Sequence, residues 1–538
     1  MIKEYPWYDA PMIENLKHLI EYAAENYGNS PAFTFERKGE DITVDFIQLK
    51  NDIYALGTYF YSLGLKNGDK IAVIGENSYE WIVTYFAAVD GSNVIVPIDK
   101  ELGATEVANL IKSCEAKAFV YAESKAKLIE EAKAMMPSVE YYVPMADFGD
   151  IISKGNEMID GGNDAFEKNV IDENALCTLI YTSGTTGTPK GVMLCQRNLT
   201  YDMVHSCRTF LEPPGTVVVL PLHHTFGFMA GILCQIHRGF PVYINNNLRN
   251  VLSDIKKAKP AHICVVPLFV ETFYKSLWKT VKKQKKDKML KALIKISNVL
   301  RKVGIDLRKQ LFQSVKNGFG GNLEMIIAGG APLDLKYAKG FEDLGIAIIN
   351  GYGITECSPI VSLDRNKKYK FGAAGIPVPG TQVQIYNPNE DGEGEIIVKG
   401  DHVMMGYYNN PEATEAAFVD GWFRTGDIGT MDSDGFVHIT GRIKNIIILS
   451  NGKNVYPEEI ETVVLQRVEG VNEIVVYGED DVICAEIYTE TPDEKDRIKK
   501  DVQELNAILP PMKQIKRISF RDTEFEKTTT KKIKRYTR

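Results

Sequence analysis

One loop of the sequence carries the side chains that a polyphosphate needs. Residues 181–191 read YTSGTTGTPKG and directly follow an apolar run. Glycines leave backbone N–H groups accessible, the serine and threonines add hydroxyls, and Lys190 adds a positive charge, so the loop is rich in donors to phosphate oxygens. It is not a Walker A loop, because Pro189 precedes the lysine and Gly191 follows it. A flexible linker is the alternative, but linkers rarely follow a buried strand directly.

Hydroxyl, carboxylate and aromatic side chains gather in a second glycine-rich stretch, NGYGITE at residues 350–356. Thr355 and Glu356 suit a Mg²⁺ ion that keeps several waters and bridges substrate phosphates. Tyr352 could lay its ring on a purine, although tyrosine is more often a core residue. A surface ion pair is the alternative for Glu356, because glutamate is usually exposed. The stretch is compatible with a nucleotide and its metal.

The remaining polar candidates have two interpretations each. Asp427 and Arg442 can bond to ribose hydroxyls or form a surface ion pair. The adjacent His223 and His224 invite a metal, but neighbouring side chains point apart in a strand and no Cys or acidic cluster accompanies them in the sequence. We therefore predict no metal there, and a solvated loop histidine stays possible. Lys532 lies in a basic, threonine-rich tail that would ordinarily be a solvated terminus.

Together these motifs resemble the ANL superfamily of adenylate-forming enzymes, which includes acyl- and aryl-CoA synthetases, adenylation domains of nonribosomal peptide synthetases and firefly luciferase. After the phosphate loop, six further motifs occur in the family's order over nearly the whole chain. They are PLHHTFG at 221–227, GGAP at 329–332, NGYGITE at 350–356, GWFRTGD at 421–427, GRIKN at 441–445 and KTTTKKIKR at 527–535.

The resemblance implies a role for each matched residue. The catalytic set is Lys190, His224, Thr355, Glu356 and Lys532, and the metal set is Glu356 and Thr182. The set that binds ATP and the thiol cofactor is Thr182, Ser183, Gly184, Thr185, Thr186, Gly187, Lys190, Gly330, Ala331, Pro332, Asn350, Gly351, Tyr352, Gly353, Thr355, Asp427, Ile439, Arg442, Lys444, Gly452 and Lys532. His224 is expected to line the acid pocket near the α-phosphate. Lys532 is expected to stabilise the charge that builds when a carboxylate attacks the α-phosphorus.

The chain departs from the family pattern beside the catalytic lysine. Glu526 stands where proline is usual and Lys531 where glycine is usual, which leaves the conformation of that loop open. The motif at 221–227 lacks the aspartate that pairs with the ammonium of amino-acid substrates, so an amino acid is disfavoured. Residues 450–454 resemble the loop that lines the pantetheine tunnel, which favours coenzyme A as acceptor.

A basic segment, residues 275–309, is similar to long-chain fatty acyl-CoA synthetases. Its lysines and one-sided leucines and isoleucines could form an amphipathic helix on an anionic membrane, or a solvated helix over the core. We therefore expect an AMP-forming ligase that joins a carboxylic acid, predicted to be a long-chain fatty acid, to coenzyme A with ATP and Mg²⁺. Loading of a separate acyl carrier protein, an aryl or medium-chain acid, and a non-catalytic nucleotide-binding regulator remain alternatives.

The elements that must position these residues are those of an α/β protein. Apolar β-branched runs at residues 70–74, 93–98, 117–121 and 176–181 alternate with helical patterns, which is typical of a buried parallel sheet. From 372 to 435, frequent Gly, Pro, Asn and Asp separate short strands and indicate a small antiparallel or barrel-like subdomain. We predict a large domain over residues 1–442, with two α/β subdomains and the barrel-like one, and a mobile α+β domain over 443–538.

Bulk composition agrees with a compact protein of at least two domains. The chain has 538 residues, of which 44% are hydrophobic and 25% charged. Its net charge of −8 argues against nucleic acid as the main partner. The eight cysteines form no closely spaced pair, the N-terminal residues lack the apolar core of a signal peptide, and apolar runs are too short to span a bilayer. We expect a cytoplasmic protein, with peripheral contact to the inner membrane face as a possibility.

Overall fold

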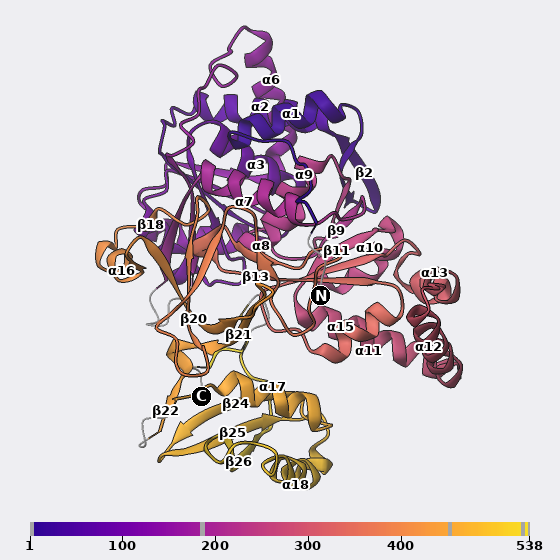
Figure 1. The fold of residues 1–538 in the computed structure, drawn as a ribbon. Helices are drawn as coiled ribbons and strands as arrows, with labels where there is room; N and C mark the ends of the chain where they lie inside the picture. The colour runs from indigo at the N-terminus through magenta and orange to yellow at the C-terminus, as the bar shows by residue number, and fades with distance from the viewer. Residues whose placement is uncertain (1–4, 183–188, 450–453, 529–532, 536–538) are drawn as a thin grey trace.

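The computed structural model describes residues 5–182, 189–449, 454–528 and 533–535. Two large sheets flanked by helices form the upper part of the molecule, and an antiparallel sheet lies beside them (Figure 1). A small sheet with two helices hangs below and holds the C-terminus. This mixed α/β architecture, with a large N-terminal part and a small C-terminal part, confirms the predicted fold class.

The first large sheet contains the apolar runs predicted from the sequence. Its seven strands have the order β18-β8-β7-β4-β3-β5-β6, and β7, β4, β3, β5 and β6 run parallel. The strands are β3 (Lys70–Ile74), β4 (Val94–Ile98), β5 (Ala118–Tyr121), β6 (Tyr141–Pro144), β7 (Leu176–Thr182), β8 (Lys190–Cys195) and β18 (Gly406–Tyr407). The helices between them are α3 (Tyr79–Asp90), α4 (Ala104–Cys114), α5 (Ala126–Ala132) and α6 (Phe148–Asp160). Every residue of β4 is buried, as a two-sided sheet requires.

The second large sheet has nine strands in the order β15-β14-β13-β12-β11-β9-β10-β1-β2. The strands are β1 (Pro31–Arg37), β2 (Glu40–Asp45), β9 (Thr216–Val218), β10 (Val242–Ile244), β11 (His262–Val265), β12 (Met325–Ala328), β13 (Ala347–Gly353), β14 (Ile360–Leu363) and β15 (Ile376–Pro377). The helices α10 (Val251–Ala258), α11 (Pro267–Lys283) and α15 (Leu335–Asp343) share one hydrophobic cluster with strands β9 to β13. These helices therefore cover one face of the sheet.

Helices that pack on both large sheets join them into one hydrophobic core. These are α1 (Leu16–Tyr27), α2 (Phe46–Ser62), α7 (Gln196–Thr209), α8 (Thr225–Phe228) and α9 (Cys234–Arg238). A π-helical turn, Met229–Leu233, connects α8 to α9. Residues 221–227, which contain His224, therefore lead directly into the hydrophobic core between the two large sheets.

Residues 382–442 form an antiparallel sheet, as their turn-rich composition predicted. Its path is β16-β17-β20-β19, and β21 pairs with β20. The elements are β16 (Gln382–Tyr386), β17 (Gly394–Lys399), α16 (Pro411–Ala416), β19 (Phe418–Val419), β20 (Trp422–Met431) and β21 (Val437–Arg442). Its last strand ends at Arg442, where the chain passes into the C-terminal part.

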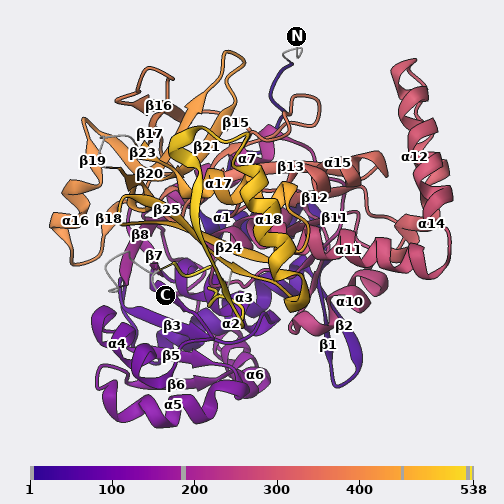
Figure 2. The same ribbon diagram turned by 90° about the horizontal axis from the view of Figure 1, so that it is seen from below.

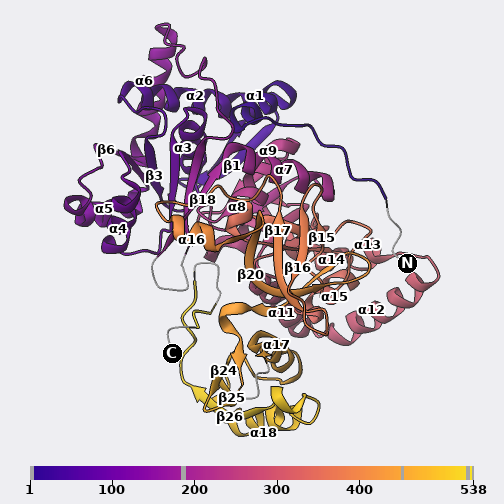
Figure 3. The ribbon, with the colours of Figure 1, turned by 60° about the vertical axis from the view of Figure 1, so that its left-hand side comes forward.

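The C-terminal part has a small hydrophobic core of its own. Its elements are β22 (Ile447–Ile448), β23 (Asn454–Val455), α17 (Pro457–Arg467), β24 (Glu473–Glu479), β25 (Val482–Tyr488), α18 (Lys495–Leu505) and β26 (Ile515–Arg521). Figure 3 shows this part below the antiparallel sheet, joined to it through the segment after β21. The boundary between 442 and 443 remains a prediction, and so does the mobility of the C-terminal part.

The basic segment forms α12 (Asp287–Lys302), followed by α13 (Arg308–Leu311) and α14 (Gln313–Lys316). Figure 2 shows α12 standing at the edge of the molecule, away from the sheets. Leu290 and Ser297 are its buried residues, so only one side faces the protein. In the part of the chain that the structure describes, every helix is too short or too polar to cross a membrane.

Candidate active site

The phosphate loop leaves one strand of the first sheet and returns along its neighbour. Thr182 ends β7 and Lys190 begins β8, and the two residues are paired across the antiparallel strands. The Thr182 hydroxyl lies 3.4 Å from the carbonyl oxygen of Lys190. Ser183, Gly184, Thr185, Thr186 and Gly187, which we predicted to bind phosphate, lie outside the described residues. Both ends of the loop are therefore fixed at the edge of a buried sheet.

Tyr407 connects the loop lysine to the predicted metal ligand. The Nζ atom of Lys190 lies 4.8 Å from the centre of the Tyr407 ring, a cation–π contact. The hydroxyl of the same tyrosine donates to Glu356 Oε1 at 2.9 Å. Burial and the negative charge of Glu356 raise the pKa of Tyr407, so this phenol remains a donor at neutral pH. Lys190 thus contacts the ring face of Tyr407, and Glu356 accepts from its hydroxyl.

Sequence analysis missed Tyr407, because no local motif identifies it. Tyr407 lies in β18, which pairs with β8 so that Tyr407 stands opposite Val192. The N–H of Met404 donates to the carbonyl oxygen of Glu356 at 2.8 Å, which fixes the segment before β18 against the glutamate. The nearest signal in the sequence is the pair of adjacent tyrosines at 407 and 408 after a glycine. Only tertiary pairing shows which ring reaches the site.

Tyr352, Asp427 and Arg442 form a second polar group, built across two sheets. The Tyr352 hydroxyl donates to Asp427 Oδ2 at 2.6 Å, and Arg442 Nε lies 2.6 Å from Asp427 Oδ1. Asp427 and Arg442 are cross-strand partners on β20 and β21. Burial of the Arg442 guanidinium opposes its charge, but Asp427, Tyr352 and Glu356 raise its pKa. Tyr352 lies on β13 and Glu356 on the 3₁₀ turn that follows it, four positions later, so one short segment joins the two polar groups.

Two glycines of these motifs occupy positions that a side chain would disturb, one because of close packing and one because of its backbone angle. A Cβ atom on Gly353 would lie 2.0 Å from the carbonyl oxygen of Pro359, and Gly330 adopts a φ of +84° that side chains disfavour. Gly330, Ala331 and Pro332 follow β12, and Asn350 and Gly351 lie on the adjacent strand β13. The side chain of Asn350 donates to the carbonyl oxygen of Ala373 at 2.7 Å. Residues 330–332 and 350–353 thus lie at the end of two neighbouring parallel strands.

The two histidines are arranged differently from the prediction. They lie at the entry to α8 rather than in a strand, and their rings are 4.3 Å apart instead of pointing away from each other. An acid also accompanies them, because His223 Nε2 lies 3.5 Å from Asp99 Oδ1. Burial opposes ionisation of Asp99, but His223 outweighs it and lowers the pKa of that carboxyl to about 2. Asp99 follows β4, so its position could not be inferred from the histidine motif alone.

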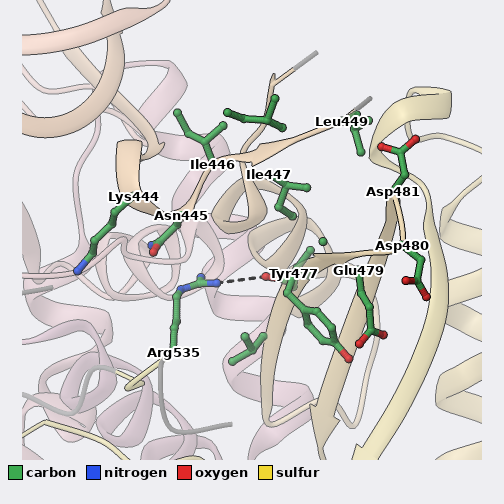
Figure 4. Close-up of a pocket in the computed structure, with 14 residues that line it drawn as sticks. Lys444, Asn445, Ile446, Ile447, Leu449, Tyr477, Glu479, Asp480, Asp481 and Arg535 are labelled. Carbon is green, nitrogen blue, oxygen red and sulfur yellow. Dashed lines mark hydrogen bonds between the residues drawn. The ribbon is translucent and has the colours of Figure 1, made fainter. Parts of the chain in front are cut away.

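The segment after β21 lines a cavity of about 490 Å³. Figure 4 shows Lys444 and Asn445 on one side, Arg535 at the centre, and Tyr477, Glu479 and Asp480 on the other. Arg535 donates to the carbonyl oxygen of Val476 at 3.4 Å and forms an ion pair with Glu461. Desolvation and the neighbouring Arg442 lower the pKa of Lys444.

The remaining predicted residues divide between described and undescribed parts of the chain. Ile439 is on β21 with 38% of its surface exposed, three positions before Arg442. Thr355 begins the short 3₁₀ turn that also holds Glu356. Gly452 and Lys532 lie outside the described residues, although Lys527 and Ile533 on either side of the latter form an antiparallel bridge. The two polar groups of the described site thus hold one lysine, one arginine, two carboxylates and two buried tyrosines.

This arrangement is that of a nucleotide-dependent enzyme, and known proteins agree. A family model described as AMP-binding enzyme matches residues 20–408, and one described as AMP-binding enzyme C-terminal domain matches 444–537. A long-chain-fatty-acid–CoA ligase of Mycobacterium bovis is 30% identical over 434 residues, 76% of this chain and 71% of the relative. One from Salmonella typhimurium is 29% identical over 504 residues, 86% of this chain and 83% of the relative. An anthranilate CoA ligase in complex with anthranoyl-AMP has a TM-score of 0.78 at 22% identity, covering 97% of this chain and 96% of that one.

The chain therefore belongs to the AMP-binding enzyme family, within the ANL superfamily that its ordered motifs resemble. This confirms three predictions: the family, the enzymatic nature of the protein, and its class as an AMP-forming acyl-CoA ligase. The individual roles of the site residues, the metal and the acid remain predictions.

Proposed function

We propose that the protein activates a long-chain fatty acid with ATP, forms the acyl-adenylate with release of pyrophosphate, and transfers the acyl group to coenzyme A. The observation that carries the proposal is the proximity of two polar groups. Lys190, Tyr407 and Glu356 stand beside the phosphate loop, and Tyr352, Asp427 and Arg442 stand where a nucleoside would bind. A phosphate-binding and a nucleoside-binding group side by side suit one ATP molecule.

In the first step a carboxylate oxygen of the acid attacks the α-phosphorus, and the bond to pyrophosphate breaks. Lys190 and the phosphate loop hold the phosphates, Thr355 contacts the α-phosphate, and His224 orients the acid. Lys532 stabilises the negative charge on the transferring group. Glu356 and Thr182 are the residues that would hold Mg²⁺, since a carboxylate and a hydroxyl beside phosphates match its preference for oxygen ligands. The ion would neutralise charge on the phosphates when bound.

In the second step the thiol of coenzyme A attacks the acyl carbonyl and AMP leaves. The proposed C-terminal domain, residues 443–538, turns about Lys444 to withdraw Lys532 and bring Gly452 to the thiol. The cavity beside Lys444 and Arg535 lies next to this proposed hinge, between the segment after β21 and the C-terminal sheet. Loading of a separate acyl carrier protein instead of coenzyme A is the alternative second step.

The choice of a fatty acid as substrate rests on the names of the relatives and on the apolar side chains next to the motif that contains His224. The relatives of Mycobacterium bovis and Salmonella typhimurium are named as long-chain-fatty-acid ligases. Phe226, Ala230, Ile360 and Leu363 border the interior next to that motif and give it an apolar lining. An aryl acid is the second candidate, since the anthranilate ligase shares the fold.

Acid-dependent ATP–pyrophosphate exchange across fatty, aryl and amino acids tests this proposal. We expect exchange with a fatty acid, and acyl-CoA with AMP once coenzyme A is added. Exchange with aryl acids alone would reassign the substrate, and transfer only to a carrier protein would reassign the acceptor. ATP binding without exchange for any acid would contradict an enzymatic role and favour a nucleotide-binding regulator.

We also propose that α12 rests on the anionic inner face of a membrane, where fatty acids partition. Met289, Ile296, Val299 and Val303 recur at helical spacing and are 54–70% exposed. Exposed lysines run along one side of this strip, at positions 288, 291, 295 and 302. Buried Leu290 and Ser297 hold the opposite side against the protein. A basic helix with an exposed apolar strip matches the chemistry of an anionic lipid surface.

Sedimentation with vesicles of neutral lipid, with or without about one third phosphatidylglycerol, tests this contact. The wild-type protein should bind the anionic vesicles at low salt. Replacing Lys288 and Lys295 by Glu should weaken binding at least ~tenfold. The control replaces Lys499 and Lys500, exposed on α18, by Glu, and makes the same change in net charge. Equal binding by both variants would exclude α12 as the contact.

A further inference from the structure

Three side chains with metal-ligating atoms meet between the end of β4 and the start of α8. They are Asp99, which directly follows β4, and the adjacent His223 and His224. One ligand atom of each lies within 4.8 Å of the other two, and no other such group of three occurs among the described residues. The two reasons for predicting no metal here do not hold in the structure, because the histidine rings are 4.3 Å apart and an acid accompanies them.

The separation of Asp99 from His223 fits two ligands of one metal ion better than a hydrogen bond. His223 Nε2 lies 3.5 Å from Asp99 Oδ1, beyond the roughly 2.7–3.2 Å of ordinary N–H···O hydrogen bonds. His223 is 7% exposed, and its Nε2 atom has no hydrogen-bond partner among the described residues. Two atoms bound to one tetrahedral zinc ion are about 3.4 Å apart. The buried nitrogen and the carboxylate oxygen are therefore spaced for an ion between them.

Hydrogen bonds to the backbone hold both parts of this group in place. The side chain of Asn77, which follows β3, donates to the carbonyl oxygen of Leu220 at 2.9 Å and accepts from the N–H of Leu222 at 3.1 Å. The N–H of Glu101 donates to Asp99 Oδ1 at 2.9 Å. The segment before the histidines and the carboxylate are thus fixed to the ends of the neighbouring strands β3 and β4. Ligands held in position before binding lose less freedom when the ion arrives.

The types of ligand define the class of ion. Two imidazoles and one carboxylate are a set that proteins use for zinc and other transition metals, with a water or substrate in the open position. Mg²⁺ prefers oxygen ligands, so this group should discriminate against the magnesium that accompanies ATP. His223 is buried, whereas Asp99 and His224 are partly exposed, which leaves one side of the group for the entry of an ion and for a water ligand.

We propose that Asp99, His223 and His224 bind one divalent transition-metal ion, with Zn²⁺ as the best match, and that the bound ion inhibits the enzyme. The inhibition rests on the proposed function, in which His224 orients the acid. A metal that takes the lone pair of this ring withdraws His224 from that role. The binding site depends only on the three side chains, so binding and inhibition are tested separately.

Titration of the whole, metal-free chain with Co²⁺ tests the site, because the visible spectrum of Co²⁺ reports the number and type of its ligands. We expect about one Co²⁺ per chain, with the spectrum of a four- or five-coordinate ion. Zn²⁺ should displace it, since zinc binds such ligands more tightly, and excess Mg²⁺ should not. Absence of binding, or displacement by Mg²⁺, would overturn the proposal.

Variants connect the bound ion to these side chains. Asp99→Asn and His223→Gln should each weaken Co²⁺ binding by about 100-fold or more, because loss of a contact that merely orients a ligand already costs about 10- to 100-fold. Asp99→Asn keeps the shape of the side chain and protects the test against loss of folding in the buried change. Asp432→Asn and His438→Gln are the matched controls, since these side chains lie 3.0 Å apart but belong to no group of three ligands among the described residues. Wild-type affinity in Asp99→Asn, or lost binding in the controls, would overturn the assignment.

Pyrophosphate exchange shows the effect of the ion on the enzyme. Zn²⁺ should slow exchange in competition with the acid, and a chelator should restore the rate. Relative to its own rate without zinc, Asp99→Asn should need at least about tenfold more Zn²⁺ for the same inhibition. Exchange that continues unchanged with Zn²⁺ bound would overturn the inhibition. Exchange with no acid in the absence of zinc would overturn the proposed function and leave the metal site standing.

Discussion

The polar groups of the nucleotide region and those of a small cavity inside the core, the inner cavity, are satisfied in opposite ways. Tyr352, Asp427 and Arg442 bond to one another at 2.6 Å, across β13, β20 and β21. Ser206, Glu212 and Gln235 surround a small space, and each leaves one buried atom without a partner among the described residues. Both regions contain buried carboxylates, but only one of them has its hydrogen bonds complete.

The difference indicates which region is expected to meet a ligand. Ribose hydroxyls must compete with hydrogen bonds that Asp427 already makes, so the nucleotide region is ordered before binding. The inner cavity, with two acceptors and one hydroxyl around about 20 Å³, has the size and chemistry of a buried water site. The first polar group is therefore expected to face a nucleotide, whereas the second belongs to the core.

The largest expected effect concerns the catalytic step rather than binding in either region. Lys532→Ala should lower adenylate formation by roughly a thousandfold or more, because the charge of the transition state loses its stabilising lysine. Thioester formation from supplied acyl-adenylate should remain, since the proposed second step does not use Lys532. Rapid-quench measurement of each half-reaction distinguishes these outcomes. Equal loss in both half-reactions would contradict the division of labour.

Asp427→Asn should disrupt the nucleotide region and leave the acid region unchanged. The variant keeps the shape of the side chain but removes the charge that pairs with Arg442 and accepts from Tyr352. We expect KM for ATP to rise about 10- to 100-fold, from the loss of charged hydrogen bonds worth ~1.5–3 kcal/mol. The ratio of the kcat/KM values for two different acid substrates should not change. A large change in that ratio would show that the two regions are coupled.

The inner cavity should make stability depend on pH. Burial raises the pKa of Glu212 from 4.5 to about 7, against the opposing effect of Arg238. The folded protein therefore holds this proton more tightly than the unfolded chain. The resulting contribution to the free energy of unfolding is complete below about pH 4.5 and is lost as the pH rises to about 7. Chemical denaturation from pH 4.5 to 7.5 should show a smaller decline in the free energy of unfolding for Glu212→Gln than for the wild type. Glu25→Gln, on the exposed side of α1, should follow wild type.

The smallest expected effect concerns the tyrosine between Lys190 and Glu356. Tyr407→Phe removes the hydrogen bond to Glu356 and keeps the ring beside Lys190. A single hydrogen bond of about 0.5–1.5 kcal/mol corresponds to a loss of roughly 2- to 10-fold in kcat/KM for ATP. Tyr407→Leu, which also removes the ring, should lower kcat/KM for ATP further. Equal rates for the two variants would mean that the ring has no effect on Lys190.

The sequence predicted those parts of the site that lie within a motif. The strand before the phosphate loop and the short antiparallel strands after residue 372 follow from local spacing and composition. Each of these features depends on residues that are neighbours along the chain.

Residues brought in from distant segments could not be predicted in this way. Tyr407 reaches Glu356 because β18 pairs with β8, and Asp99 reaches His223 because β4 ends beside α8. Ser206, Glu212 and Gln235 are ordinary polar residues in the sequence, and only their shared burial around one cavity distinguishes them. The prediction that the histidines point apart was wrong because it assumed a strand, whereas α8 begins there.

The most direct test of the central claim follows the fate of α-labelled ATP with the preferred acid. Acyl-adenylate should accumulate when coenzyme A is omitted, and adding coenzyme A should convert it to acyl-CoA with one AMP released for each thioester formed. Release of ADP, or release of AMP that does not depend on the acid, would contradict an AMP-forming acid–thiol ligase.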